Sequence, residues 1–358
     1  MGARSIARVY VEREIAAEPR TLAILNRLPK AEHVECSRYG EVFNRKAQDF
    51  RLQKHRPALI LARKHRGLVL PAPPGYGVGG KHNFYFSHML NCLYDCRYCF
   101  LQGMFRSANY VLFVNYEDFF AAIEHRLAEA GGDDVWFFSG YDCDSLALES
   151  LTGFAAEFLP FFAERPHAWL ELRTKSTQIR SLLELEAIDN CVVAFSFTPE
   201  TAHRRLETGV PSIGSRLEAM AKLAARGWRL GVRLDPLLWS ERFEEEYLGL
   251  LDRVFDAIPV ASLHSVSFGP FRLPPDFYRR MAKLMPNERL FAGALETADG
   301  MVSYPAKLER EMAEFLNTEL ARRVPAEVLF PCIFAEPSSP AGAAQAAPDT
   351  QRSEARSP

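Results

Sequence analysis

The sequence predicts an α/β fold, a partial (β/α)6 barrel that follows an N-terminal extension. Between residues 116 and 284, short apolar runs alternate with amphipathic helical segments. This alternation, with strands that are apolar almost throughout, is typical of a parallel sheet covered by helices. One strand before residue 91 and five after it make about six βα units, fewer than the eight of a closed barrel. The 358 residues, 48% of them hydrophobic, are enough for one such core with extensions.

Composition divides the chain into three parts. Residues 1–80 are expected to form an α+β extension, with a short helix over Arg20–Arg27. A stretch rich in proline and glycine, 71–77, marks the entry to a barrel domain over residues 81–325. Residues 336–358 are mainly Pro, Ala, Ser and Gln with few large apolar side chains, so we expect a disordered C-terminal tail there.

Local patterns indicate where the strands and helices of the barrel domain lie. The expected strands cover 135–138, 168–173, 191–197, 228–234 and 263–268. The expected helices cover 116–130, 151–163, 178–185, 212–226, 243–257, 275–284 and 306–323. Asn115 can cap the first of these helices, and Gly131 and Gly227 can end the helices that precede them.

Three of the seven cysteines, Cys92, Cys96 and Cys99, lie within eight residues of one another, in a segment without a helical apolar stripe. Thiolates this close in sequence converge on one centre only if the loop wraps around it. Three Cys ligands without an obvious fourth would hold a four-iron cluster and leave one iron open. The alternatives are a structural zinc site completed by His82 or His88, and cysteines that are simply buried.

Polar residues follow the predicted barrel strands at the point where each ends. In parallel βα folds the functional site lies at the carboxyl ends of the strands, so we expect these residues to share one site. After the cysteine loop they are the segments 139–144, 173–176 and 233–236, with Ser196, Thr198, Ser267 and Gly269.

The cysteine loop resembles that of the radical S-adenosylmethionine superfamily, a Cys-x3-Cys-x2-Cys run with an aromatic residue, here Tyr98, before the last cysteine. Its continuation is similar to the Cys-x-Tyr-Cys-Tyr-Leu-Gln of the spore photoproduct lyase family, with Phe100 in place of the second tyrosine. Further segments that are similar to motifs of this family are 196–200, 207–209, 212–216 and 235–236. The resemblance covers roughly residues 55–325 and implies a barrel of the radical S-adenosylmethionine type.

This resemblance implies a [4Fe-4S] cluster on the three cysteines, with S-adenosyl-L-methionine on the open iron as the source of a 5′-deoxyadenosyl radical. It also implies that Lys175 and Ser196 bind S-adenosylmethionine, and Ser139 is a further cofactor-binding candidate. A lysine offers a compact cation for a carboxylate, and a serine hydroxyl offers one donor and two acceptors.

Two residues are candidates for returning a hydrogen atom to the product radical. The family has a cysteine at the second strand end, where this chain has Tyr141, and Cys143 lies two residues further on. Residues two apart in an extended segment share a face. Either a phenol or a thiol can donate, although Cys143 can equally be a structural thiol. Arg233 stands where the family tends to have His, which would alter the charge near the substrate.

Some features are typical of nucleic-acid binding. From Glu41 to Arg66 there are eight Lys and Arg against two acidic residues, a stretch that can follow a phosphate backbone or form a solvated face. Tyr98 and Tyr304 are candidates for stacking against a damaged base flipped out of DNA. The net charge of −2 gives no global signal for nucleic acid.

The resemblance therefore predicts a radical S-adenosylmethionine lyase that repairs a thymine-type DNA lesion, with an electron donor such as flavodoxin or ferredoxin. The alternatives are a radical enzyme with another nucleic-acid or small-molecule substrate, and a non-enzymatic, metal-stabilised nucleic-acid-binding protein. No apolar run approaches membrane-spanning length, and the first ten residues lack the apolar core of a signal peptide. Because clustered thiols suit a reducing compartment, we expect a cytoplasmic protein.

Overall fold

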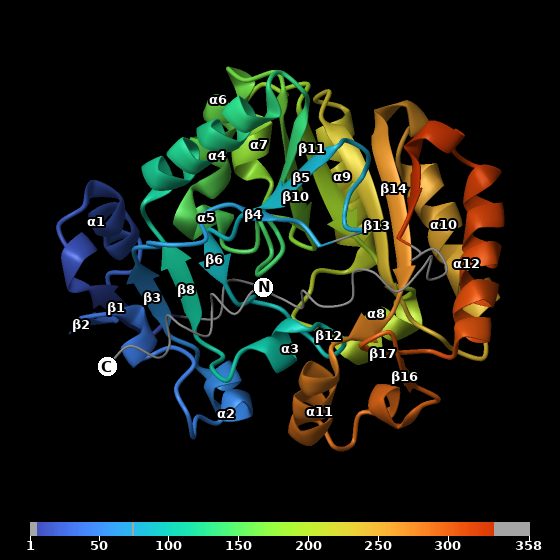
Figure 1. Cartoon of the computed structure of the whole chain (residues 1–358), viewed down its shortest axis with the longest axis horizontal. Helices are drawn as coiled ribbons and strands as arrows, with labels where there is room; N and C mark the ends of the chain where they lie inside the picture. Colours follow the sequence, from blue (N-terminus) through green and yellow to red (C-terminus); the bar gives the residue numbers. More distant parts are fainter. Residues whose placement is uncertain (1–5, 74, 333–358) are drawn as a thin grey trace.

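Two sheets of mainly parallel strands organise the chain (Figure 1). The structure, a computed structural model, describes residues 6–332 except residue 74, so the tail predicted over 336–358 lies outside the described residues. The first sheet has the strand order β2 (Glu32–Cys36), β1 (Arg8–Glu12), β3 (Leu59–Ala62), β8 (Tyr110–Phe113), β6 (Met89–Leu90). Its pairings are parallel apart from β6 with β8, and it takes in segments from both sides of residue 80.

The second sheet is the curled sheet of a partial barrel, and it confirms the predicted fold class. Its strand order is β18 (Leu329–Pro331), β14 (Leu263–Pro270), β13 (Arg229–Leu237), β11 (Cys191–Ser196), β10 (Ala168–Thr174), β9 (Val135–Phe138), β5 (His82–Tyr85), β4 (Leu70–Pro71). The pairings are parallel except that β4 runs antiparallel to β5. The sequence pattern missed β18, which has only three residues and extends the sheet beyond β14.

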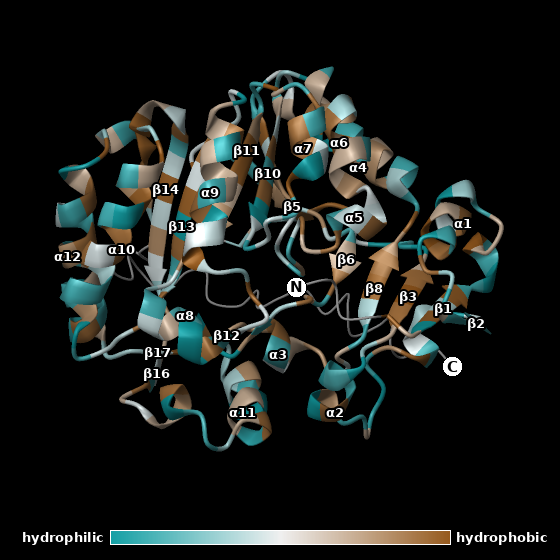
Figure 2. Cartoon of the chain, turned by 180° about the vertical axis from the view of Figure 1, so that it is seen from behind, coloured by the Kyte–Doolittle hydropathy of each residue, from teal (hydrophilic) through white to brown (hydrophobic). Residues whose placement is uncertain are grey.

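Helices cover the outer face of the barrel sheet, and Figure 2 shows that these helices carry both hydrophilic and hydrophobic residues. The helices are α1 (Pro19–Asn26), α2 (Phe50–His55), α3 (Leu101–Met104), α4 (Tyr116–Ala130), α5 (Glu149–Thr152), α6 (Phe154–Ala163), α7 (Arg180–Glu184), α8 (Glu200–Leu206), α9 (Ile213–Ala224), α10 (Phe243–Ala257), α11 (Pro275–Leu284) and α12 (Ala306–Ala321). Two small antiparallel sheets pair β7 (Asp95–Cys96) with β12 (Glu207–Thr208), and β17 (Met301–Ser303) with both β15 (Arg272–Leu273) and β16 (Glu296–Ala298). Within the described chain, no helix has the length and apolarity needed to span a membrane.

Strand β9 shows why the barrel strands are apolar on both faces. Phe137 packs against Phe162 of α6, with ring centroids 5.9 Å apart. Trp136 belongs to a different cluster of buried residues and stacks on Trp169 at 4.9 Å. At Gly80 the backbone has φ +78°, and a Cβ would lie 2.5 Å from Cδ1 of Trp136, so only glycine fits this approach. Burial on both faces removes the polar alternation of an exposed sheet.

Helix α4 begins and ends where the sequence predicts, but the predicted cap is wrong. Gly131 ends the helix in the left-handed conformation, with φ 62°. The side chain of Asn115 makes no capping hydrogen bond. Its amide oxygen instead accepts from the backbone N–H of Lys64, and its amide nitrogen donates to the Lys64 carbonyl, both at 2.9 Å. This tertiary contact joins the segment after β3 to the start of α4 and outcompetes the local cap.

The predicted helix over 151–163 is interrupted near its start. Gly153, at φ 62°, separates α5 from α6, so the longer helix begins only at Phe154. The other predicted strands and helices are present, with ends that differ by a few residues.

A buried histidine under the first sheet gives the fold a test in acid. His88 is 1% exposed and stacks on Phe154, with ring centroids 3.7 Å apart. Burial, together with the nearby Lys64 ammonium, lowers the pKa of His88 to about 3. The unfolded chain then binds more protons than the folded chain between about pH 3 and 6.5, so stability falls as the pH falls through this window.

We expect His88→Phe to lose this acid sensitivity, because phenylalanine keeps the stacking and cannot take up a proton. In urea unfolding at pH 5, relative to pH 7.5, the wild type should lose about 2 kcal/mol more than the variant. Above pH 7 the two proteins should respond alike, which serves as an internal control. Equal losses at pH 5 would contradict the assignment.

Candidate active site

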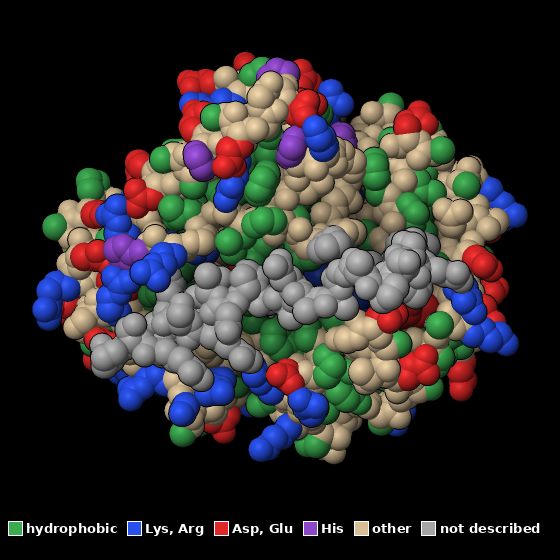
Figure 3. Space-filling view, viewed as in Figure 1, with side chains coloured by type: hydrophobic (Ala, Val, Ile, Leu, Met, Phe, Trp, Pro, Cys, Tyr) green, Lys and Arg blue, Asp and Glu red, His purple; other side chains and the backbone are tan. Residues whose placement is uncertain are grey.

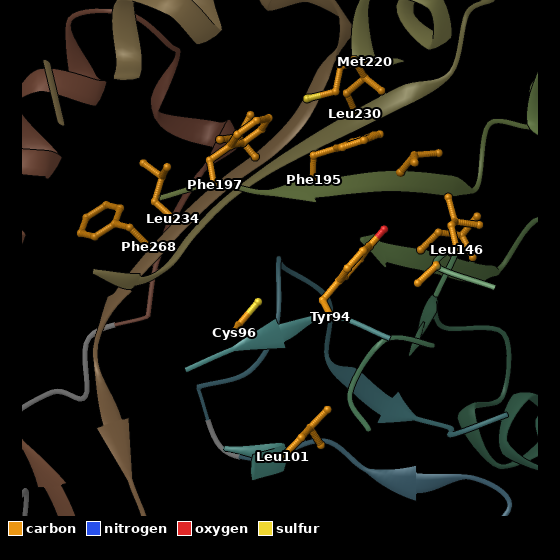
Figure 4. Packing of buried hydrophobic residues seen from close by; sticks show 14 of the residues in the cluster. Tyr94, Cys96, Leu101, Leu146, Phe195, Phe197, Met220, Leu230, Leu234 and Phe268 are labelled. Atoms are coloured by element: carbon orange, nitrogen blue, oxygen red, sulfur yellow. The ribbon is translucent and has the colours of Figure 1, made fainter. Parts of the chain in front are cut away.

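The three clustered cysteines face one cavity at the carboxyl ends of the barrel strands. Cys92, Cys96 and Cys99 line a cavity of about 220 Å³ together with residues after β9 and residues at the carboxyl ends of β10 and β13. The loop is held in register because β7 pairs with β12, which places Cys96 opposite Glu207. Figure 4 shows the side chains of Tyr94 and Cys96 pointing from this loop towards β11, which carries Phe195, and the segment after it, which carries Phe197.

Burial favours the protonated thiol over the thiolate for all three cysteines of this loop. It raises the pKa of Cys92 to about 12 and the pKa of Cys96 well above its usual range, and it also raises the pKa of Cys99. Thiolates are the metal-binding form, and they become stable here only when a cationic group binds among them. Three thiols around one cavity therefore fit an iron–sulfur cluster chemically.

The zinc alternative required a histidine near these cysteines, and neither candidate is there. Nε2 of His82 lies 3.2 Å from a carboxylate oxygen of Asp133 at the surface, and His88 is stacked on Phe154. Among residues 6–73 and 75–332, no three His, Cys, Asp or Glu side chains lie close enough together to hold a single metal ion. Each thiol of a four-iron cluster binds a different iron atom, so such thiols need not converge on one point.

A buried carboxylate, Glu207, ties the cysteine loop to the barrel. It accepts hydrogen bonds from Nζ of Lys175 at 2.8 Å and from the hydroxyl of Tyr98. On its other side it accepts from His203 at 2.9 Å and from Arg216 at 3.2 Å. Burial alone would raise the pKa of Glu207, but Lys175, His203 and Arg216 together hold that pKa well below its usual range. The carboxylate is therefore ionised and its position is fixed by several elements.

Lys175, which the sequence predicts to bind the cofactor, lies at the cavity. It follows β10, lines the cavity, and its side chain is 14% exposed. Within the described chain its ammonium donates to Glu207 and to the Tyr98 hydroxyl, each at 2.8 Å. Its backbone N–H donates to Asp144, a carboxylate that also lines the cavity. Because an ammonium has three donors, Lys175 retains capacity for a ligand carboxylate.

The two predicted serines differ in where they lie. Ser196, at the end of β11, lines the cavity, and its carbonyl accepts from Arg216 at 2.6 Å. Ser139 is fully buried, and its hydroxyl bonds with the Ser145 hydroxyl and the Glu171 carbonyl. The structure thus brings Ser196 to the cavity and leaves Ser139 in the barrel wall.

Tyr141 stands in an aromatic surround on the cavity. Its ring centroid lies 4.5 Å from that of Tyr85, and 5.5 Å from those of both Tyr76 and Phe100. Burial and the nearby Asp142 raise the pKa of Tyr141 to about 12. The phenol therefore keeps its proton at neutral pH.

Cys143 also lines the cavity, but its thiol is embedded in packing. It is 6% exposed, and its Sγ lies 3.7 Å from the carbonyl oxygen of Ser139. It belongs to the same buried cluster as Met89 and Leu148 of the first sheet and its surroundings. The thiol sits at the seam between the two sheets.

Arg233 is part of a buried ion network in the barrel interior. Glu171 accepts from Arg233 at 2.7 Å and from Arg173 at 2.9 Å. Burial would raise the pKa of Glu171, yet these two guanidinium groups lower it to about 2. The charge of Arg233 is thus balanced within the wall, whereas Arg173 reaches the cavity and lies over the ring of Tyr76.

Both tyrosines that are expected to stack on a base, Tyr98 and Tyr304, are buried. Tyr98 is 5% exposed and bonded to Glu207. Tyr304 is 7% exposed, packs against Phe271, and its hydroxyl accepts from the backbone N–H of Trp239 at 3.0 Å. Tyr98 lines the cavity, and Tyr304 follows the β16–β17 hairpin beside it.

The Lys and Arg side chains of the basic stretch 41–66 divide into two groups, one in contact with the protein interior and one exposed. Half of its Lys and Arg residues make contacts inside the protein: Arg51, Lys54, Arg63 and Lys64. The other four are exposed: Arg45, Lys46, Arg56 and Arg66. Figure 3 shows Lys and Arg side chains at the surface in the region of the N-terminal sheet and along the lower edge of this face.

Sequence reasoning missed several residues that line the cavity. Tyr76 comes from the proline-rich entry segment, and Phe271 and Arg272 come from the connection that begins β15. Tyr76 sits in a segment that reads as a linker, and Phe271 lies beyond the predicted end of its strand. No local pattern marks either of them.

Comparisons with known proteins agree with this geometry. A family model described as spore photoproduct lyase matches residues 84–296. A spore photoproduct lyase of Geobacillus sp. (strain Y412MC61) is 23% identical over 247 residues, 65% of this chain and 72% of the relative. That of Bacillus subtilis (strain 168) is 25% identical over 178 residues, 49% of this chain and 52% of the relative.

Solved structures share the fold. A spore photoproduct lyase mutant with bound AdoMet and dinucleoside spore photoproduct superposes with a TM-score of 0.81 at 18% identity, covering 92% of this chain and 98% of that chain. A spore photoproduct lyase complexed with dinucleoside spore photoproduct gives 0.80 at 17% identity, covering 93% and 100%. The match extends over both sheets, because nearly all of this chain is aligned.

The Glu207 network yields a test of the site's architecture. In Glu207→Gln the neutral amide leaves Lys175 and Arg216 without their counter-ion in a buried setting. We expect the free energy of unfolding in urea to fall by about 3 kcal/mol. Glu200→Gln, at a surface carboxylate paired with Arg204 and Arg253, should cost less than about 1 kcal/mol. Equal, small losses in both variants would show that Glu207 does not hold the site together.

Proposed function

Because the chain belongs to the spore photoproduct lyase family, we propose that it repairs a thymine-type lesion in DNA through radical S-adenosylmethionine chemistry. The observation that carries the proposal is the convergence of Cys92, Cys96 and Cys99 on one cavity beside Lys175 and Ser196. These residues come from the cysteine loop and from the ends of β10 and β11. A set of this kind suits both a cluster and a cofactor that carries a carboxylate group.

Each part of the cofactor set has residues that suit it. The three cysteines would hold a [4Fe-4S] cluster, Lys175 would bind the carboxylate of S-adenosylmethionine, and Ser196 its polar groups. With both groups bound, the site would supply a 5′-deoxyadenosyl radical, and an electron donor such as flavodoxin or ferredoxin would reduce the cluster. The chain's own residues position the cofactor and exclude water, since the cysteine loop and the strand ends enclose it. Such a protein would work in the cytoplasm.

Arg173, Asp235 and Arg272 also line the cavity and are available to contact the lesion. A base inside a duplex must be extruded to reach such a cavity, and a damaged base is cheaper to unstack. The exposed cations Arg45 and Lys46 are suited to the phosphate backbone, because each neutralises a phosphate without reading sequence. The structurally similar enzymes that hold a dinucleoside spore photoproduct support this substrate class.

We assign the return of the hydrogen atom to Tyr141. Its ring lines the cavity, and its raised pKa keeps the phenolic O–H bond intact at neutral pH. Cys143 is the other candidate, but its thiol lies in the packed seam against Ser139. Tyr98 has its hydroxyl engaged by Glu207 and Lys175, which fits it better for positioning the loop than for donating to product.

Anaerobic reconstitution with iron and sulfide tests the cofactor assignment. The wild type should show a visible charge-transfer band, and it should release 5′-deoxyadenosine when S-adenosylmethionine and a reductant are added. Cys96→Ala should lose most of the iron and reduce deoxyadenosine formation by more than tenfold, because one of the three ligands is gone. A protein that retains zinc alone and forms no deoxyadenosine would overturn the proposal.

Turnover of a dinucleoside spore photoproduct tests the substrate and the donor. Wild type should release thymine-containing repair product. Tyr141→Phe should still cleave S-adenosylmethionine but lose clean repair by at least tenfold and yield side products, since the phenylalanine ring has no transferable hydrogen. Cys143→Ala should repair cleanly, which makes it the matched control.

The opposite pattern, with clean repair in Tyr141→Phe and loss in Cys143→Ala, would reassign the donor to the thiol. Deoxyadenosine formation without any lesion cleavage by the wild type would exclude this lesion as substrate. It would favour another nucleic-acid substrate for the same radical.

A further inference from the structure

Helix α2 places a buried cation against the backbone of the cysteine loop. Lys54 is 4% exposed, and its Nζ donates to the carbonyl oxygens of Cys92 at 2.9 Å and Tyr94 at 3.2 Å. A buried ammonium is costly unless its donors are satisfied. Here the two carbonyls that accept from Lys54 belong to Cys92, a proposed cluster ligand, and to Tyr94 of the same loop. The position of the loop therefore depends on the buried charge of Lys54.

Arg51, one helical turn before Lys54 in α2, makes a second contact with the loop. Arg51 donates from both terminal nitrogens to the two carboxylate oxygens of Asp95, each at 3.1 Å. Asp95 is buried and also accepts from Gln102 at 2.7 Å. A two-pronged contact of this kind fixes the orientation of the carboxylate as well as its distance. The part of the loop that precedes Cys96 is thereby tied to α2 through Arg51 and to α3 through Gln102.

Helix α2 is itself firmly anchored, so it can act as a support. Its first turn is capped by Asp49, which accepts from the backbone N–H of Leu52 at 2.9 Å, and Phe50 is 2% exposed. Gln53 accepts from the backbone N–H of Ala108 at 2.9 Å and from the Ser107 hydroxyl at 3.1 Å. These contacts bind the helix to the segment between α3 and β8.

We propose that Lys54 is a positioning residue for the cluster, and that its charge raises the reduction potential of the cluster held by the loop. The inference rests on the cofactor assignment made above. One-electron reduction of a cluster adds negative charge, and a nearby cation in a low-dielectric setting favours the more negative state. The α2 helix lies outside residues 84–296, the part matched by the family model.

The same argument reassigns part of the basic stretch. Lys54 and Arg51 appear in the sequence as members of a cationic run suited to a phosphate backbone. Their contacts direct them inward, where the negative partner is the cysteine loop. The run therefore combines surface cations with two cations that serve the cofactor site.

The decisive experiment is a redox titration of anaerobically reconstituted protein, followed by electron paramagnetic resonance, with dithionite as the one-electron donor and no nucleic acid present. Lys54→Met removes the charge and keeps the length of the side chain. We expect its midpoint potential to become more negative by about 59 mV, which corresponds to a roughly tenfold smaller equilibrium constant for uptake of the electron. Lys30→Met, at an exposed lysine of the N-terminal region, is the matched control and should titrate like the wild type.

Two further readouts separate a charge effect from misfolding. Iron content and thermal unfolding of Lys54→Met report whether the loop still assembles. If this variant does not fold, Arg51→Leu, at a side chain 34% exposed, takes its place and should shift the potential in the same direction by a smaller amount. A folded Lys54→Met protein, or in its place a folded Arg51→Leu protein, with full iron content and an unchanged potential would overturn the inference.

This test does not depend on repair activity. A protein that binds the cluster and shows the shift, but does not cleave the lesion, would sustain the role of Lys54 and refute only the substrate. A protein that binds no cluster at all would refute the cofactor assignment and the inference with it.

Discussion

The site depends on one buried carboxylate that is shared by four separate elements. Glu207 begins β12, and its oxygens accept from the loop residue Tyr98, from Lys175 after β10, from His203 of α8 and from Arg216 of α9. A buried anion of this kind is tolerated only where several donors meet it. Because those donors come from distant parts of the chain, satisfying the charge forces the cysteine loop, the barrel strands and α9 into one arrangement. The cavity is a consequence of that arrangement.

A second buried carboxylate, Glu171, is likewise held by several donors in the barrel interior. Glu171 stands between Arg173 and Arg233, and Arg233 also donates to the Ser265 hydroxyl at 2.8 Å. Arg173 also interacts electrostatically with Asp235, so two carboxylates and two guanidinium groups meet in this part of the barrel. Arg173 reaches the cavity wall, where it lies over the ring of Tyr76.

The cysteine loop is supported from three sides, and the first two supports are Glu207 towards the barrel and α2 towards the N-terminal sheet. The first side fixes Tyr98 next to Cys99, and the second fixes the backbone at Cys92 and Tyr94. On a third side, α3 lies against α11 so closely that a Cβ at Gly103 would be 2.6 Å from the carbonyl oxygen of Phe277. The N-terminal sheet is thus part of the site's framework and more than an appendage to the barrel.

The sequence by itself determined the fold class, most of the strands and helices, and the three cysteines that converge on the cavity. These properties are local, because apolar periodicity and close spacing of ligands can be read within a few residues. Only the tertiary structure decided which polar residues reach the cavity. It placed Ser196 there and kept Ser139 in the wall, it turned Asn115 from a helix cap into a partner of Lys64, and it directed Lys54 inward. These outcomes depend on which distant group satisfies each buried charge or hydrogen bond, and the sequence around a residue carries no record of that partner.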